Sequence, residues 1–242
     1  MGGATELAGD LTPEAVAASL PGRPIHAFPA LLSTDADALA WARAGAPDGA
    51  VVVSEYQASP RGRAGIEWSP AANASLVFSL VVRQRLPAER EGWLYVAAST
   101  ALADALGEGA ATRWPDEVWR DGERAAAVGV FAQVVGPELA WAVITVLLQS
   151  ARPPRAPLLA AAVESLERRI ASPTTPVLAD YLRRCETIGT SVRARMVPLG
   201  PGGLVVSGTA RNVKPDGALV VEADDGRRLA VRAPNLGLLE QA

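Results

Sequence analysis

Residues 58–70 have the sequence ASPRGRAGIEWSP and separate two apolar runs of the chain. Gly62 and Gly65 permit tight backbone turns in this loop, and Arg61 and Arg63 supply two guanidinium groups. Such a loop can hold an anion in a nest of backbone N–H and guanidinium donors. Isolated arginines on a polar loop are also commonly solvated, so the interpretation depends on the neighbouring segments.

The neighbouring segments predict an α/β domain followed by a small β-domain. Residues 50–53 and 75–82, before and after the loop, are predicted strands, and residues 125–148 are predicted to form two buried strands joined by a turn. After Gly189, short alternating stretches are separated by Gly, Pro and Asp turns, which is typical of a small β-barrel. We therefore expect the α/β domain to end near residue 186.

Helical spacing and capping residues predict five helices around these strands. They are expected over residues 12–20, 34–44, 91–106, 157–170 and 175–185. Residues 21–29 are rich in proline and are predicted to be a connector, and residues 114–118 are predicted to be a short irregular piece. His26 lies in the connector without a second His or Cys nearby, so it is not expected to bind a metal.

The composition excludes several classes of protein. Hydrophobic residues make up 49% of the 242 residues and charged residues 20%, as in ordinary globular proteins. A net charge of −3 gives no support for a nucleic-acid or membrane partner. One cysteine, Cys185, excludes an internal disulfide and a multi-cysteine zinc site. The N-terminus lacks a signal-peptide pattern and no apolar run is long enough to span a bilayer, so we expect a cytoplasmic protein.

Several motifs, in this order, resemble the biotin–protein ligase family of the biotin/lipoate ligase superfamily. Ser33-Thr34-Asp35 resembles its Ser-Thr-Asn before a helix, and residues 61–70 resemble its R-G-R-x-G-R-x-W-x-S-P loop. Residues 113–118, RWPDEV, resemble K-W-P-N-D-[LIV], and residues 208–226 resemble part of its C-terminal barrel. That family attaches biotin to a lysine of a carboxyl-carrier domain through a biotinyl-adenylate.

The resemblance implies a fold and a domain organisation. Residues 30–186 are expected to form the mixed-sheet α/β domain of the biotin–protein ligase type, and residues 187–242 a small SH3-like β-barrel. Residues 1–29 are expected to be an N-terminal extension with a short helix, too short for the DNA-binding domain of the regulatory branch of the family.

The resemblance also implies roles for individual residues. The catalytic residues would be Arg63, Arg113 and Arg124. The residues that bind a biotin-like acid would be Ser33, Thr34, Gln57 and Arg61. The nucleotide-binding residues would be Trp68, Trp114, Asp116 and Glu117. Mg²⁺ would bind, if at all, at Asp116 or Glu117. Each residue also has a simpler structural interpretation: Ser33 and Thr34 can cap a helix, and the tryptophans can belong to the core.

The departures from the family pattern concentrate in the nucleotide half of the site. They are an arginine replaced by Ile66, two lysines by Arg113 and Arg124, Asn-Asp by Asp116-Glu117, and two strand glycines by Thr145 and Leu147. Arginine keeps the charge of lysine but presents a planar fork in place of a compact ammonium. Side chains at the two glycine positions fill space that the family leaves open.

Two functions follow as hypotheses. The first is a divergent homologue in which the acid-binding half is partly kept and the nucleotide half is degenerate, so that it is non-catalytic or has an altered substrate. The alternative is an active ATP-dependent biotin–[carboxyl-carrier protein] ligase that uses ATP and Mg²⁺ and works through biotinyl-5′-AMP. In both, the ligand is biotin or a similar carboxylic acid, and the partner is a carboxyl-carrier protein or another protein acceptor. The protein would be a monomer or a homodimer.

Overall fold

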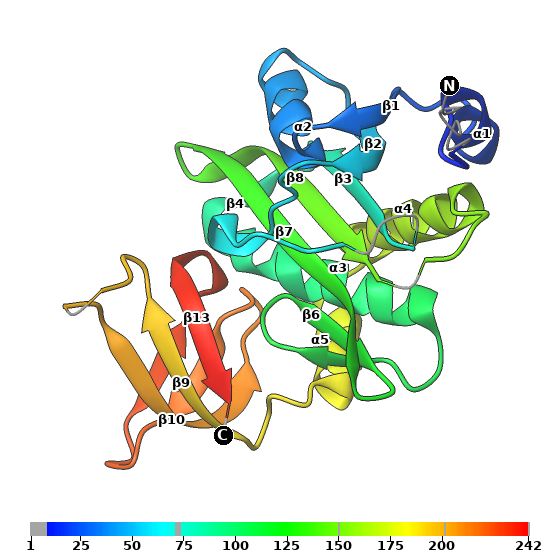
Figure 1. The fold of residues 1–242 in the computed structure, drawn as a ribbon. Helices are drawn as coiled ribbons and strands as arrows, with labels where there is room; N and C mark the ends of the chain where they lie inside the picture. The colour runs from blue at the N-terminus through cyan, green and yellow to red at the C-terminus, as the bar shows by residue number, and fades with distance from the viewer. Residues whose placement is uncertain (1–8, 71–73, 150, 201, 242) are drawn as a thin grey trace.

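The computed structural model describes residues 9–70, 74–149, 151–200 and 202–241. It contains an eight-stranded mixed sheet covered by helices and a separate five-stranded sheet (Figure 1). This confirms the predicted fold class, a mixed-sheet α/β domain followed by a small β-domain. Residues 1–8 of the predicted N-terminal extension lie outside the described residues.

The first part of the chain forms one edge of the large sheet. It contains α1 (Pro13–Ser19), β1 (Ile25–Leu31), α2 (Thr34–Arg43) and β2 (Val51–Gln57). The predicted connector over residues 21–29 is wrong in its second half, because β1 pairs in parallel with β2. Pro29 suggested a loop, but β1 is an edge strand, where proline is tolerated. The large sheet therefore begins before the predicted boundary at residue 30.

The centre of the large sheet is antiparallel, and its two faces are covered by different helices. Its strands are β3 (Leu76–Val82), β7 (Glu123–Val135) and β8 (Glu138–Leu148), with the short β4 (Leu86–Pro87) also paired to β8. α2 packs on the face that carries Val52 and Val81. The opposite face carries Val51 and Val53 and is covered by α3 (Glu91–Leu106), α4 (Ala156–Ala171) and α5 (Thr174–Arg184). Neighbouring valines reach opposite cores because successive strand residues alternate in direction.

The far edge of the large sheet is a hairpin of β5 (Ala111–Arg113) and β6 (Glu117–Arg120). Its turn contains the cis peptide bond between Trp114 and Pro115. The prediction of an irregular piece over residues 114–118 is therefore wrong for its last two residues, which begin β6. The pairing places Arg113 directly opposite Glu117.

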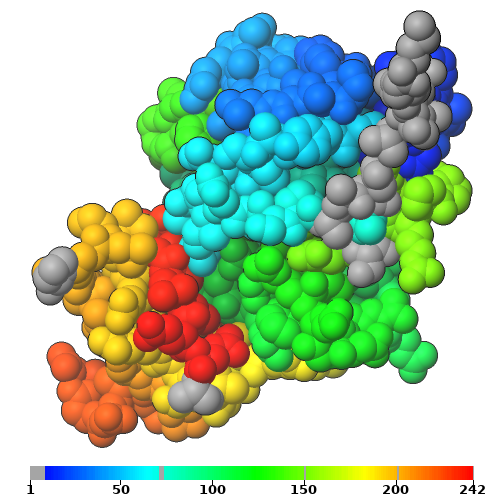
Figure 2. All heavy atoms as spheres, viewed as in Figure 1, coloured from blue at the N-terminus to red at the C-terminus, as the bar shows by residue number. Residues whose placement is uncertain are grey.

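The small domain is an antiparallel sheet in the order β12-β11-β10-β9-β13. Its strands are β9 (Ser191–Met196), β10 (Val205–Val213), β11 (Leu219–Glu222), β12 (Arg228–Val231) and β13 (Leu236–Gln241). β13, red in Figures 1 and 2, lies on the side of this sheet that faces the α/β domain. None of the helices in the described parts of the chain is long and apolar enough to span a membrane.

Candidate functional site

The loop that contains Arg61 and Arg63 lies directly on the large sheet. A Cβ atom on Gly129 of β7 would be 3.1 Å from the Cα of Gly62, which is tighter than an ordinary contact, so the loop backbone approaches β7 closely at this glycine. A Cβ atom on Gly62 would collide with the indole ring of Trp68, which folds back over the loop. The glycines of this motif therefore allow the loop to pack between the sheet and Trp68.

Arg63 joins this loop to two other parts of the molecule. Its side chain is 7% exposed, and its Nε lies 3.1 Å from Oδ2 of Asp116 in the β5–β6 turn. Its Nη1 donates hydrogen bonds to the backbone carbonyls of Leu236 and Gly237 in β13. The predicted catalytic arginine is thus committed to contacts within the chain, including the small domain.

Asp116 has an unusual protonation equilibrium. Burial raises the pKa of its carboxyl to about 6, the nearby guanidinium of Arg63 opposes that rise, and the charge of Glu117 adds to it. Burial also raises the pKa of the neighbouring phenol of Tyr95, whose hydroxyl donates to the carbonyl of Val130 at 3.3 Å. The Arg63–Asp116 pair therefore lies in a poorly solvated environment.

A cavity of about 360 Å³ lies between the β5–β6 hairpin and β13, and its side of Arg63 is called the nucleotide side, after the residues predicted to bind a nucleotide. It is lined by every residue predicted to be catalytic or nucleotide-binding: Arg63, Trp68, Arg113, Trp114, Asp116, Glu117 and Arg124. Leu238, Leu239 and Gln241 of β13 complete the wall, and no sequence motif indicated them. The motifs therefore converge in space, and the chain's own C-terminal strand covers the cavity.

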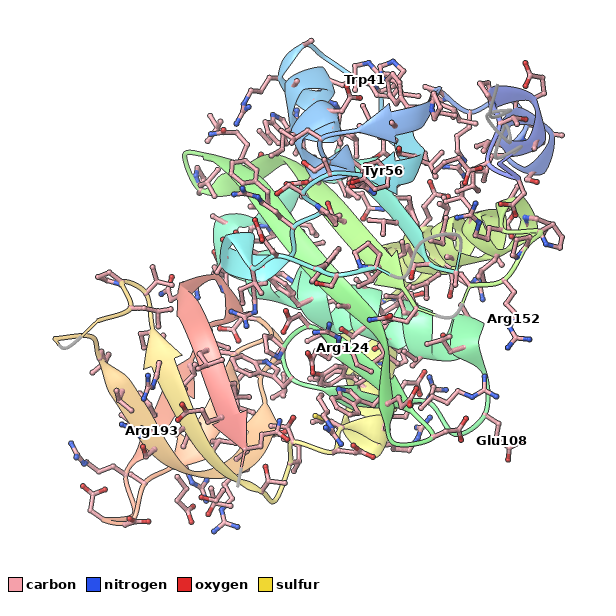
Figure 3. The ribbon with its side chains drawn as sticks, in the orientation of Figure 1. Trp41, Tyr56, Glu108, Arg124, Arg152 and Arg193 are labelled. Carbon is pink, nitrogen blue, oxygen red and sulfur yellow. The ribbon has the colours of Figure 1, made fainter. Side chains whose placement is uncertain are left out.

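The remaining two arginines of this cavity are also held by carboxylates. Arg113 Nε lies 2.9 Å from Oε2 of Glu186, and its guanidinium stacks over the ring of Trp119 at 3.7 Å. Arg124, beside β6 near the middle of the molecule in Figure 3, has its Nη1 3.1 Å from Oε1 of Glu117. Each predicted catalytic cation is therefore neutralised by an acidic side chain of the protein itself.

The two tryptophans assigned to nucleotide binding have structural roles here. Trp114 is 2% exposed, and its Nε1 donates to the carbonyl of Gly217 in the small domain at 2.9 Å. Trp68 forms an apolar cluster with Val77, Ala127 and Leu147. Leu147 occupies a position where the family pattern has glycine, and its side chain fills the space beside the indole.

The two acidic residues of the cavity are both engaged by other side chains of the protein. Asp116 is paired with Arg63, and Glu117 accepts from both Arg124 and the indole of Trp119. Within the described residues, no group of three or more His, Cys, Asp or Glu side chains surrounds a common point. Mg²⁺ in nucleotide sites is held by one or two carboxylates together with waters and phosphate oxygens, so Asp116 or Glu117 would have to leave its present partner to bind the ion.

Two of the residues predicted to bind an acid, Thr34 and Gln57, belong to an internal polar network, and a third, Ser33, caps a helix. The amide of Thr34 donates to Oε1 of Gln57 at 2.8 Å, and the hydroxyl of Ser79 donates to Oγ1 of Thr34 at 3.0 Å. Thr145 Oγ1 lies 2.8 Å from the same Ser79 oxygen. Ser33 caps α2, its Oγ accepting from the Ala36 amide at 3.4 Å. Thr145 also lines the nearest cavity, so it connects this network to that cavity.

That nearest cavity, about 420 Å³, lies on the other side of Arg63 and beneath the loop. Among its lining residues are Asp35, Arg61, Tyr95, Phe131 and Thr145. Arg61 belongs to a sequence motif, whereas Tyr95 and Phe131 do not, because aromatic residues in apolar segments give no signal that separates a cavity wall from a core. Asp35 Oδ1 is buried without a hydrogen-bond partner among the described residues.

Solved structures with the same fold come from several bacteria. Biotin protein ligase from Aquifex aeolicus, in complex with biotin and ATP, superposes with a TM-score of 0.67 at 14% identity over 90% of this chain and 99% of that one. A biotin protein ligase-like protein of unknown function from Silicibacter gives 0.67 at 15% identity, over 88% and 96% of the two chains. At such identities the likeness shows the fold alone.

Sequence similarity identifies the family. No protein-family model matches the chain. The biotin–[acetyl-CoA-carboxylase] ligase of Mycobacterium tuberculosis is 32% identical over 229 residues, which cover 83% of this chain and 84% of that protein. With this identity over most of both sequences, the chain belongs to the biotin protein ligase family.

Proposed function

We propose that this protein is a non-adenylating member of the biotin protein ligase family that binds biotin or a similar carboxylic acid. The observation that carries the proposal is the pairing of Arg63, Arg113 and Arg124 with carboxylates of the chain. Adenylation brings a carboxylate and an anionic α-phosphate together, which requires positive charge that is free to meet them. A nucleotide that uses these arginines would have to compete with Asp116, Glu117 and the half-exposed Glu186.

The packing of the nucleotide side supports the same proposal. Leu147 is fully buried beside Trp68, and Ile66 replaces an arginine of the family pattern at the rim of the cavity. Leu238 and Leu239 of β13 add apolar side chains to a wall that would have to face a triphosphate. A highly charged ligand is poorly solvated by such a wall.

The cavity beneath the loop supports retained acid binding. Arg61 is half exposed, and its only ion pair among the described residues is a long contact of 4.0 Å with Glu67, so its guanidinium is available to a carboxylate. The unpartnered Oδ1 of Asp35 can accept from an N–H group, such as those of a ureido ring. Tyr95 and Phe131 provide apolar wall for the rest of the ligand.

The partner in this proposal is a carboxyl-carrier protein or another protein that carries the acid. The M. tuberculosis relative is named for its action on acetyl-CoA carboxylase, which makes a carrier domain of that enzyme the first partner to test. The protein would act as a monomer or a homodimer, and it would require neither ATP nor Mg²⁺.

The alternative is an active ATP-dependent ligase that works through biotinyl-5′-AMP. The observation in its favour is the 32% identity to a ligase over most of both chains. Under this alternative, ATP and Mg²⁺ would displace the internal ion pairs on binding.

Two measurements distinguish the proposals. Calorimetry with biotin should show binding that Arg61→Gln weakens and that the control Arg113→Gln leaves unchanged. Biotin-dependent exchange of pyrophosphate into ATP, measured with excess Mg²⁺, should stay at the level without enzyme. Exchange above that level, or transfer of biotin to a purified carrier domain, would establish the active ligase instead.

A further inference from the structure

A separate groove lies between α5 and the turn that joins β10 to β11, away from both cavities of the candidate site. Its volume is about 560 Å³ and its walls are mainly apolar. The residues that line it are Arg90, Thr174, Thr175, Leu178, Ala179, Leu182, Pro215 and Asp216. One wall thus belongs to the α/β domain and the other to the small domain.

The two walls are held together by close backbone contact. A Cβ atom on Gly92, at the start of α3, would lie 2.7 Å from the carbonyl oxygen of Asp216, and one on Gly217 would collide with the backbone of Gly92. The carbonyl of Gly217 also accepts the indole hydrogen bond of Trp114 at 2.9 Å. The groove is therefore already formed in the absence of a ligand, as most small-molecule sites are.

Arg90 is the one charged group of this groove that has no partner of opposite charge among the described residues. Its Nη2 donates to the hydroxyl of Thr174 at 2.6 Å, and its guanidinium lies 5.0 Å from the ring centroid of Trp93. Burial lowers the pKa of this guanidinium, as expected for a cation that has lost water without gaining a carboxylate.

The other charge of the groove is already compensated. Asp216 Oδ2 lies 3.6 Å from the ammonium of Lys214, and its Oδ1 accepts from the backbone amide of Ala218 at 3.1 Å. The carboxylate therefore stabilises its own turn. What the groove offers a ligand is an apolar surface and one uncompensated cation.

We propose that this groove binds a small monocarboxylic acid with an aliphatic or aromatic body. The carboxylate pairs with Arg90 and the hydroxyl of Thr174, because a charge-assisted hydrogen bond to arginine is stronger than a neutral one. The body of the ligand covers Leu178, Leu182 and Pro215, where burial of apolar surface is favourable. A phosphate ester fits less well, since it carries more charge than the single arginine offers and meets Asp216.

The test uses octanoate as the acid and 1-octanol as its uncharged counterpart. Binding is followed by calorimetry and by the methyl NMR signals of Leu178 and Leu182, which report on this groove and not on the cavity beneath the loop. Arg90→Gln should weaken octanoate binding about tenfold or more while leaving octanol unchanged. The control Arg183→Gln, on the exposed side of α5, should leave both ligands unchanged.

A second variant keeps the test independent of any effect on folding. Ala179 is exposed at the rim of the groove, and Ala179→Glu places a negative charge there in a residue that favours helix. This variant should weaken the binding of octanoate and leave the binding of octanol unchanged. The proposal is wrong if octanoate fails to shift the two leucine methyls at millimolar concentration, or if octanoate and octanol respond alike to both variants. Biotin binding beneath the loop is a separate measurement, so either proposal can fail alone.

Discussion

Arg61 and Arg63 are separated by one glycine, yet they have different surroundings. The two cavities beside Arg63 differ in whether their charged side chains have partners within the protein. On the nucleotide side of Arg63, every arginine of the cavity is paired with a carboxylate of the chain. On the acid side, Arg61 has only a long contact with Glu67, and Asp35 keeps a buried oxygen without a partner. The arginines on the nucleotide side are paired within the protein, whereas the cavity beneath the loop has polar groups without close partners.

If the proposed function holds, this difference shows how the residues of a binding site can be kept while their side chains take up structural contacts. Arg63 lies in the motif loop, and its hydrogen bonds are made to β13 of the small domain. A buried ion needs partners whether or not a ligand is present, and partners from the chain are always available. A side chain that stays exposed is under no such requirement and remains free for a ligand.

The largest expected effect comes from removing the guanidinium of Arg63. Arg63→Ala leaves the carboxylate of Asp116 buried without its cation and two carbonyls of β13 without their donor, so the free energy of unfolding should fall by about 3 to 5 kcal/mol. Arg61→Ala removes an exposed pair and should cost about 0.5 kcal/mol or less. Urea denaturation of both variants at pH 7 measures the contrast, and equal losses would contradict the division between the two arginines.

Most of the fold followed from local patterns, and the errors have local causes. Residues 91–106 are predicted as a helix and form α3 with the same bounds, because a long apolar segment ends at Gly107, which has a positive φ. β1 was missed because Pro29 is a turn signal in sequence, and only the pairing with β2 shows that it lies at an edge. Pairing between distant segments carries information that periodicity does not.

The sequence predicted which residues line the candidate site better than it predicted the partners of those residues. The motifs indicated the residues that line the nucleotide cavity, since the resemblance extends over the whole α/β domain. They did not indicate the partner of Arg113, which is Glu186 just after the end of α5, nor the carbonyls of β13 that accept hydrogen bonds from Arg63. These contacts join segments that are far apart in sequence, and an arginine has the same appearance in a motif whether it is free or paired.

The second effect tests how fully the nucleotide side is packed. Leu147→Ala removes three carbon atoms from the fully buried cluster with Trp68, so unfolding should become easier by about 3 kcal/mol. The matched control is Leu238→Ala on β13, where the side chain is 41% exposed and the loss should stay within about 0.5 kcal/mol. A small cost at Leu147 would mean that the space beside Trp68 is loosely filled and open to an adenine ring.

The third effect is a pH dependence of the free energy of unfolding that arises from the carboxyl of Asp116. Its pKa rises from 3.8 to about 6 on folding, so the folded state holds a proton that the unfolded state releases. Stability should therefore fall as the pH rises from about 4 through 6, by up to about 3 kcal/mol at about 1.4 kcal/mol per unit of pKa difference. Denaturation series at several pH values should show this decline in the wild-type protein and not in Asp116→Asn. Glu117→Gln removes a charge that adds to the rise of the Asp116 pKa, so this variant should keep the decline in stability over a smaller range. A complete loss of the decline in Glu117→Gln would show that the titrating carboxyl is not that of Asp116.

The smallest effect tests whether the ion pair of Arg113 with Glu186 holds this third arginine of the nucleotide side. Arg113 and Glu186 form a pair that is 32% and 50% exposed, so a double-mutant cycle of Arg113→Gln and Glu186→Gln should give a coupling of about 0.5 kcal/mol at low salt. The stacking of Arg113 on Trp119 is lost in the single variant as well, which is why the cycle, and not the single substitution, isolates the ion pair. A coupling that vanishes at physiological salt would leave Arg113 held only by the indole face. Its guanidinium would then be as available as that of Arg61, and the contrast between the two sides would rest on Arg63 and Arg124 alone.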